Sequence, residues 1–116
     1  MENEFDLEER TFRFASDCRG FLKKLPKGVC NQEDGKQLVR SSGSVGANYI
    51  EANESLGKKD FLMHIKISRK EAKESRYWLR LIDTGKSRDL EIERVRLIQE
   101  ATELTRIFSA IHKKSK

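Results

Sequence analysis

Apolar residues recur every three or four positions along most of the chain, which is the spacing of neighbours on one face of an α-helix. The chain lacks the alternating Val, Ile and Thr pattern that is typical of strands. Helices are predicted over about 5–25, 31–56, 58–84 and 89–112. Short links between long helices favour antiparallel neighbours. The pattern therefore predicts an all-α fold, an antiparallel up-down-up-down four-helix bundle, formed as a single domain by residues 1–116.

Residues that break or cap helices mark the predicted boundaries. Pro26 and Gly28 separate the first two helices, and Asn31 is the predicted N-cap of the second. Gly57 is predicted to end the second helix, and Gly85 to close the third. The last four residues, KKSK, are expected to fray.

One face of each helix is predicted to point into the bundle. The first helix has two such stripes, which suggests that it is covered on two sides; they are Phe12, Ala15, Arg19 and Leu22, and Phe14, Cys18, Phe21 and Leu25. The second helix offers Leu38, Ser42, Val45, Tyr49, Ala52 and Leu56. The third offers Phe61, Ile65, Ser68, Ala72, Ser75, Leu79 and Ile82, and the fourth offers Leu97, Ala101, Leu104, Phe108 and Ile111.

Two glycines lie inside the second predicted helix, in the segment RSSGSVGANYIEANES at residues 40–55. A glycine in a helix interior costs about 1 kcal/mol relative to alanine, so close backbone approach is the expected reason for keeping it. The small residues of the third helix are the expected partners. The predicted close-packing set is Gly43, Gly46, Ser68, Ala72 and Ser75.

Basic residues are concentrated on the third helix. The chain has a net charge of +5, and residues 58–88 alone contain ten Lys and Arg against four Asp and Glu. On a helical wheel the predicted nucleic-acid-binding residues share an arc of roughly 100°. They are Lys59, Lys66, Arg69, Lys70, Lys73 and Arg80. Such an arc attracts polyanions, although a solvated helix face is the alternative interpretation.

A polar line runs along the second helix. Its members are Arg40, Ser44, Asn48 and Glu51. One interpretation is a binding groove. The favoured one is a buried hydrogen-bond network that sets helix register together with Arg69, Glu74 or Arg76 of the third helix.

Apolar residues outside the core stripes point to self-association. Ile67 and Trp78 lie outside both the core arc and the basic arc of the third helix. A dry pair at such a place is unexpected in a free monomer, so a homo-oligomer is predicted. Tyr77 and Trp78 are candidates for stacking on bases, with core or interface packing as the preferred interpretation of the Trp78 indole.

Metal, cofactor and hydrolytic chemistry find little support. Cys18 and Cys30 are expected to be free thiols, and His64 and His112 fit neither zinc-finger spacing nor the Glu-x-x-His pattern of di-metal bundles. No metal, cofactor or enzymatic activity is therefore expected. The acidic N-terminus MENEFDLEER lacks an apolar signal core, and no long apolar run is present, so a cytoplasmic location without a membrane partner is expected.

Two motifs carry a family resemblance. RSSGSVGANYIEANES and KKDFLMHIKISRKEAKESRYWLRLI resemble the bacterial four-helix-bundle family associated with intervening sequences in 23S rRNA genes. The resemblance extends to ERTFRFASD, LPKGV and ATELTRIFSAIHKKSK. It implies a ring-shaped homopentamer. It also implies kinship to the accessory variability determinant of diversity-generating retroelements, a basic barrel thought to bind nucleic acid and a reverse transcriptase.

One motif departs from that family pattern. Many members carry Asn-Ile-Ala-Glu-Gly where this chain has Asn-Tyr-Ile-Glu-Ala at residues 48–52, which indicates a different subgroup. The sequence thus favours a non-catalytic, homo-oligomeric scaffold that binds RNA or DNA through the basic arc. The alternative is a protein–protein adaptor whose basic arc meets acidic groups of a partner, and the third hypothesis is a metal-dependent enzyme.

Overall fold

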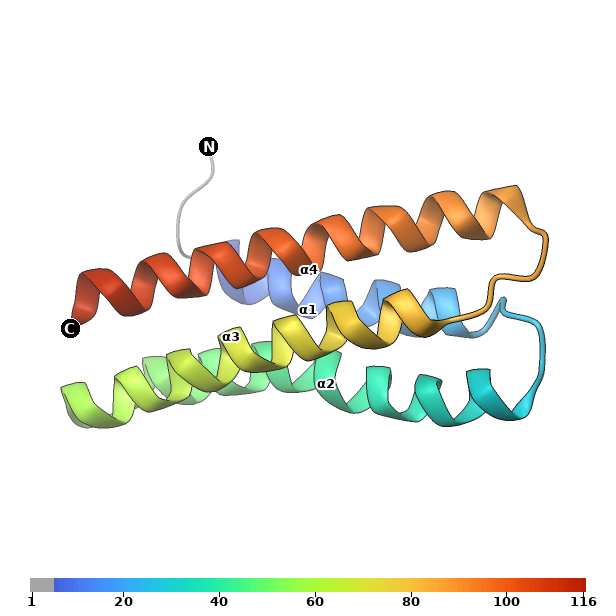
Figure 1. Cartoon of the computed structure of the whole chain (residues 1–116). Coiled ribbons are helices and arrows are strands. Elements are labelled where there is room, and N and C mark those ends of the chain that lie inside the picture. Colours follow the sequence, from blue (N-terminus) through green and yellow to red (C-terminus); the bar gives the residue numbers. More distant parts are fainter. Residues whose placement is uncertain (1–5) are drawn as a thin grey trace.

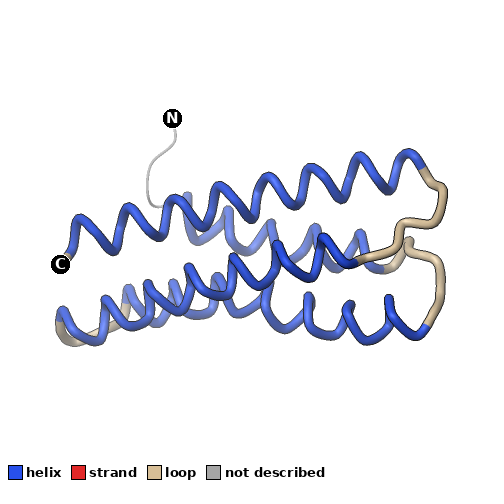
Figure 2. The backbone as a smooth tube through the Cα atoms, in the orientation of Figure 1, coloured by secondary structure: helices blue, strands red, loops and turns tan. Residues whose placement is uncertain are grey.

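The computed structural model of the protein describes residues 6–116, with four helices and, within that range, no strand (Figures 1 and 2). They are α1 (Asp6–Leu22), α2 (Val29–Asn53), α3 (Lys58–Leu81) and α4 (Arg88–Ser115). The helices run side by side and alternate in direction, which confirms the predicted all-α four-helix bundle. The predicted start of the first helix at Phe5 lies outside the described residues.

The helices pack in a ring in which each contacts its neighbours in the sequence, and α4 closes against α1. Contacts are most extensive between α2 and α3 and least between α1 and α4. The α1–α2 and α3–α4 connections lie at the same end of the bundle (Figure 1). Asn31 joins them, because its side-chain amide donates to the carbonyls of Pro26 and Asp83 at 3.0 and 2.8 Å.

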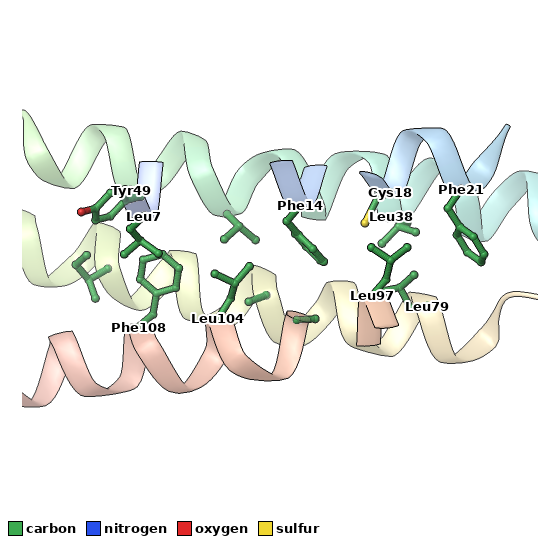
Figure 3. Close-up of a cluster of buried hydrophobic side chains, with 14 of the residues drawn as sticks. Leu7, Phe14, Cys18, Phe21, Leu38, Tyr49, Leu79, Leu97, Leu104 and Phe108 are labelled. Carbon is green, nitrogen blue, oxygen red and sulfur yellow. The ribbon is translucent and has the colours of Figure 1, made fainter. Parts of the chain in front are cut away.

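The core fills the space between all four helices (Figure 3). Phe14, Cys18 and Phe21 of α1 are fully buried. Toward the other end of the core from Phe21, the rings of Phe108 and Tyr49 meet edge-on with centroids 5.8 Å apart. Aromatic pairs in this geometry stabilise beyond the area that they bury. The buried positions follow the predicted 3–4 spacing on every helix.

Small polar side chains form the contact between α2 and α3. The Ser68 hydroxyl donates to the carbonyl of Val45 at 2.9 Å, and the hydroxyls of Ser41 and Ser75 lie 2.9 Å apart. Ala72 is fully buried between them. Small residues bring the two backbones close together and place these hydroxyls within reach of a partner.

The glycines of α2 face α1, which corrects the expectation that they face α3. A Cβ on Gly46 would lie 2.8 Å from the Oγ1 of Thr11, and one on Gly43 would lie 3.4 Å from the guanidinium of Arg19. The physical reason is register. Ser41 and Val45 lie on the α3 side of α2. Gly43 follows Ser41 by two residues and Gly46 follows Val45 by one, so the helix turns both glycines toward α1.

Several predicted boundaries were wrong. Helix α2 begins at Val29 with Gly28 as its N-cap. Asn31 lies inside the helix, and its side chain bonds to the two loops instead of capping α2. Helix α2 ends at Asn53, and Gly57 is the N-cap of α3. The C-terminal residues expected to fray remain helical to Ser115.

Two predicted core positions lie on the surface. Leu56 falls in the link between α2 and α3 and is fully exposed, because the helix ends three residues before it. Phe12 is 66% exposed beside α2, and Arg19 of the same stripe is exposed as well, whereas Leu22 at its end packs against the core.

Candidate nucleic-acid interface

Charges of opposite sign occupy different flanks of α3. On the flank toward α2, the guanidinium of Arg40 reaches Glu74 at 3.1 Å and Glu71 at 3.6 Å. Lower on the same flank, His64 contacts Asn48 at 3.0 Å and Asp60 at 3.6 Å. A cation of α2 thus holds Glu71 and Glu74, and Asp60 lies beside a histidine that contacts α2.

The six predicted cations occupy the flank toward α4 and the outward surface. Five of them are exposed and Arg69 is half-buried. Among the residues that the structure describes, none of the six forms an ion pair, although Arg10 of α1 and Arg94 of α4 do. Their charges are therefore free to meet an external anion.

The spacing of these cations produces a straight track. Lys59, Lys66, Lys73 and Arg80 follow one another at intervals of seven residues. Seven residues of α-helix advance about 10 Å and rotate only about 20° away from two full turns. The four charges therefore follow the helix axis for about 30 Å, and Arg69 and Lys70 widen the track at its middle.

The end of α4 adds positive charge to this surface. Partial desolvation, and then the charges of Lys116, Arg69 and Lys66, lower the pKa of His112. Like charges disfavour the imidazolium form. Cations of α3 therefore lie close enough to the end of α4 to act on His112.

An exposed aromatic ring stands among the cations. Tyr77 is 54% exposed, and its ring meets that of Trp78 edge-on with centroids 5.1 Å apart. The two rings and the side chains of Lys70, Lys73 and Glu74 line a hollow of about 530 Å³. For the indole of Trp78 the preferred interpretation was core or interface packing, and Trp78 does pack against the core. The signal for Tyr77 was its place four residues after Lys73, one helical turn along the basic arc.

The polar line on α2 divides into two local clusters. Asn48 donates from its amide nitrogen to the backbone and hydroxyl oxygens of Ser44, both at 3.0 Å, and its amide oxygen accepts from Nδ1 of His64 at 3.0 Å. Arg40 donates to Glu74 at 3.1 Å, and Glu74 is one of the three partners on the third helix that the predicted network offered. Glu51 is exposed, so the predicted line is not one continuous buried network.

The other two basic members of that network lie elsewhere. Arg69 and Arg76 differ by seven positions and share the α4 flank of α3, away from Arg40. Neither forms an ion pair among the described residues. The reason is that α2 packs on the opposite flank, where Ser68 and Ser75 make their hydrogen bonds.

Thiols and carboxylates do not gather into a site. Burial raises the pKa of the Cys18 thiol to about 12, and Cys30 is an exposed free thiol. In the described part of the chain, no three His, Cys, Asp or Glu side chains come together where they would hold a metal ion. Across residues 6–116, no helix has the length and hydropathy that crossing a bilayer requires.

The geometry thus defines an all-helical class of protein, a four-helix bundle in which the cations on one face of α3 have no ion-pair partner among the described residues. The family model of the 23S rRNA-intervening sequence protein matches residues 3–110, and the chain belongs to this family. A crystal structure of a protein with unknown function from the S23 ribosomal protein family of Bacteroides thetaiotaomicron superposes with a TM-score of 0.76. The two chains share 28% identity over 91% of this chain and 97% of the other. No curated protein matches the chain significantly.

Proposed function

We propose that this protein is a non-catalytic, homo-oligomeric scaffold, a pentamer, that binds RNA or DNA phosphates through the cationic face of α3. The observation that carries the nucleic-acid part is the segregation of charge on α3. Glu71 and Glu74 are paired with Arg40 of α2, and the six predicted cations have no ion-pair partner among the described residues. Unpaired cations in a row are the electrostatic footprint of phosphate binding.

Phosphate contacts of this kind fix position and carry little sequence information. Lysine and arginine on one helix face meet backbone oxygens and release counterions from the nucleic acid. We therefore expect binding that depends weakly on sequence and steeply on salt. A non-catalytic role is consistent with the use of Ser41, Ser75 and His64 in contacts between helices.

Self-association is supported by apolar surface along α1 and α2. Exposed Phe12 and Ile50 flank a groove whose floor includes Gly43, Gly46 and Ala47. A second copy of the chain would cover these residues, and the family resemblance implies five copies in a ring. Light scattering of the purified chain tests this part, and a monomer at micromolar concentration contradicts it.

A binding titration tests the cationic face. A labelled structured RNA is titrated with wild type, with Lys66→Gln, Lys70→Gln and Lys73→Gln combined, and with a matched control. The control combines Lys23→Gln, Lys27→Gln and Lys86→Gln. These three substitutions remove the same charge from exposed lysines in the loops at one end of the bundle. Each lost phosphate contact reduces the slope of log K against log salt by about 0.9 for a duplex.

The expected result is a strong loss of affinity and a slope smaller by about 2 to 3 for the α3 variant only, by the same relation. Equal losses in both variants mean that only net charge matters. Absence of binding at low salt favours the adaptor alternative. In that case the α3 cations meet acidic groups of a protein partner, and exposed Met63 and Leu81 at their margin suit such a contact.

A further inference from the structure

The cationic track of α3 has one exposed aromatic ring in its path. Tyr77 follows Lys70 by seven residues and Lys73 by four, and Arg80 follows it by three. These intervals place all four side chains on one surface of the helix. More than half of the tyrosine side chain is accessible there, at 54%.

The ring of Tyr77 packs against a second ring that contacts the core. Trp78 packs against the hydrophobic core and meets the Tyr77 ring at an interplanar angle of 77°. An edge-to-face pair covers only part of each ring, and Tyr77 remains 54% exposed beside the indole. A ring fixed in this way loses little side-chain freedom when a second ring stacks on it.

The neighbouring acidic group does not oppose an anion at this place. Glu74 lines the same hollow, but its carboxylate is paired with the Arg40 guanidinium at 3.1 Å. Lys70 and Lys73 have no ion-pair partner among the described residues. The hollow thus combines an exposed aromatic ring with two cations that have no ion-pair partner, the pairing that binds a base together with its phosphates.

We propose that Tyr77 is a stacking platform for an unpaired base and that Lys70 and Lys73 hold the adjacent phosphates, so that the α3 face prefers single-stranded to double-stranded nucleic acid. The inference rests on the proposed function and names its substrate class. In a duplex the faces of the bases are covered by their neighbours, so only the lysines contribute there. In a single strand each base has a free face, and stacking adds to the phosphate contacts.

The test measures fluorescence anisotropy with labelled oligo(U), labelled oligo(dT) and a mixed-sequence duplex of equal length. The proteins are full-length wild type, Tyr77→Ala, Tyr77→Phe and the matched control Ile92→Ala. Ile92 is a 58% exposed residue on α4, outside the cationic track, and its truncation removes a similar exposed side chain from a helix surface. Comparing oligo(U) with oligo(dT) separates RNA from DNA as the natural source of the unpaired bases.

The expected result is that Tyr77→Ala weakens single-strand binding by about tenfold and leaves duplex binding unchanged, since stacking is lost and phosphate contacts remain. Tyr77→Phe and Ile92→Ala retain wild-type affinity for both. The fluorescence of Trp78, the single tryptophan of the chain, changes when oligo(U) binds wild type, because the indole touches the stacked ring.

Three outcomes overturn the inference. If Tyr77→Ala binds single strands as wild type does while the triple lysine variant does not, the electrostatic site stands and stacking is wrong. If Tyr77→Ala lowers the solution mass and both affinities together, the ring is a contact between subunits. If wild type binds neither nucleic acid at low salt, the proposed function itself fails.

Discussion

A Cβ built on Gly46 of α2 would lie 2.8 Å from the Oγ1 of Thr11 on α1, a distance that real Cβ atoms essentially never show. The hydroxyl has little freedom to move away, because it donates to the carbonyl of Glu8 at 3.0 Å and the residue is buried. This contact defines how closely the first two helices approach one another.

The substitution Gly46→Ala is expected to lower the free energy of unfolding by about 1 to 2 kcal/mol, the overpacking penalty less the gain in helix propensity. Gly20→Ala is the control, because nothing lies within 4 Å of a Cβ at that exposed helical position. It is expected to gain about 1 kcal/mol from propensity alone. Urea denaturation followed by circular dichroism measures the free energy of unfolding of both variants. An equal gain in that free energy in the two variants would show that α1 moves away from a Cβ at position 46 at no cost.

Replacement of Arg40 by Gln is expected to destabilise the contact between α2 and α3 by about 1 to 3 kcal/mol, because Glu71 is then left without a cation. The Glu71 side chain is only 8% exposed, and its Oε1 has no hydrogen bond within the described structure. Combining Arg40→Gln with Glu71→Gln is expected to recover part of the loss. Lys36→Gln, which breaks the exposed pair with Glu33, serves as the control and is expected to change stability by less than about 0.5 kcal/mol.

Acid is expected to weaken the contact between α1 and α4. Hydrogen bonds from Gln99 and Arg10 lower the pKa of Glu103. Because the folded pKa lies below the unfolded value of about 4.3, the carboxylate stabilises the fold above that pH, and this contribution is lost as the pH falls through the folded pKa. The thermal midpoint of wild type should therefore fall more between pH 6 and pH 3 than that of Glu103→Gln. Parallel curves for the two proteins would contradict this role.

Bound phosphates are expected to raise the pKa of His112. In the free protein desolvation and the charges of Lys116, Arg69 and Lys66 lower it, and a polyanion near those cations offsets their repulsion. By linkage, nucleic-acid binding should tighten as the pH falls through that pKa. NMR titration with and without oligo(U) measures the shift, and the resonances of His64, which faces α2, provide an internal control. An unchanged His112 titration in saturated complex would place the nucleic acid elsewhere.

Much of the bundle was predictable because the spacing of apolar residues along a helix determines which of its faces is buried. Leu38, Val45, Leu79, Leu97 and Phe108 are all fully buried, as their 3–4 periodicity indicates. The cationic arc was predictable for the same reason, since it depends on the geometry of one helix. Leu56 was misplaced because helix ends depend on backbone partners that periodicity does not report.

Relations between helices were beyond the sequence. The pattern identified Gly46 as a close-packing residue but not α1 as its partner, and it named Arg69 and Glu74 as members of one network that the structure divides between two flanks. Tyr77 and Trp78 were named together as candidates for stacking on bases, yet Tyr77 is exposed while Trp78 packs against the core.

Local periodicity by itself determined that this chain forms four amphipathic helices, which residues each buries and where its positive charge collects, because a helix repeats every 3.6 residues whatever surrounds it. The tertiary structure decided which faces meet, which acids find a cation and which cations are left free. Those outcomes depend on the rotation of each helix about its axis, and that rotation is settled only when all four pack together.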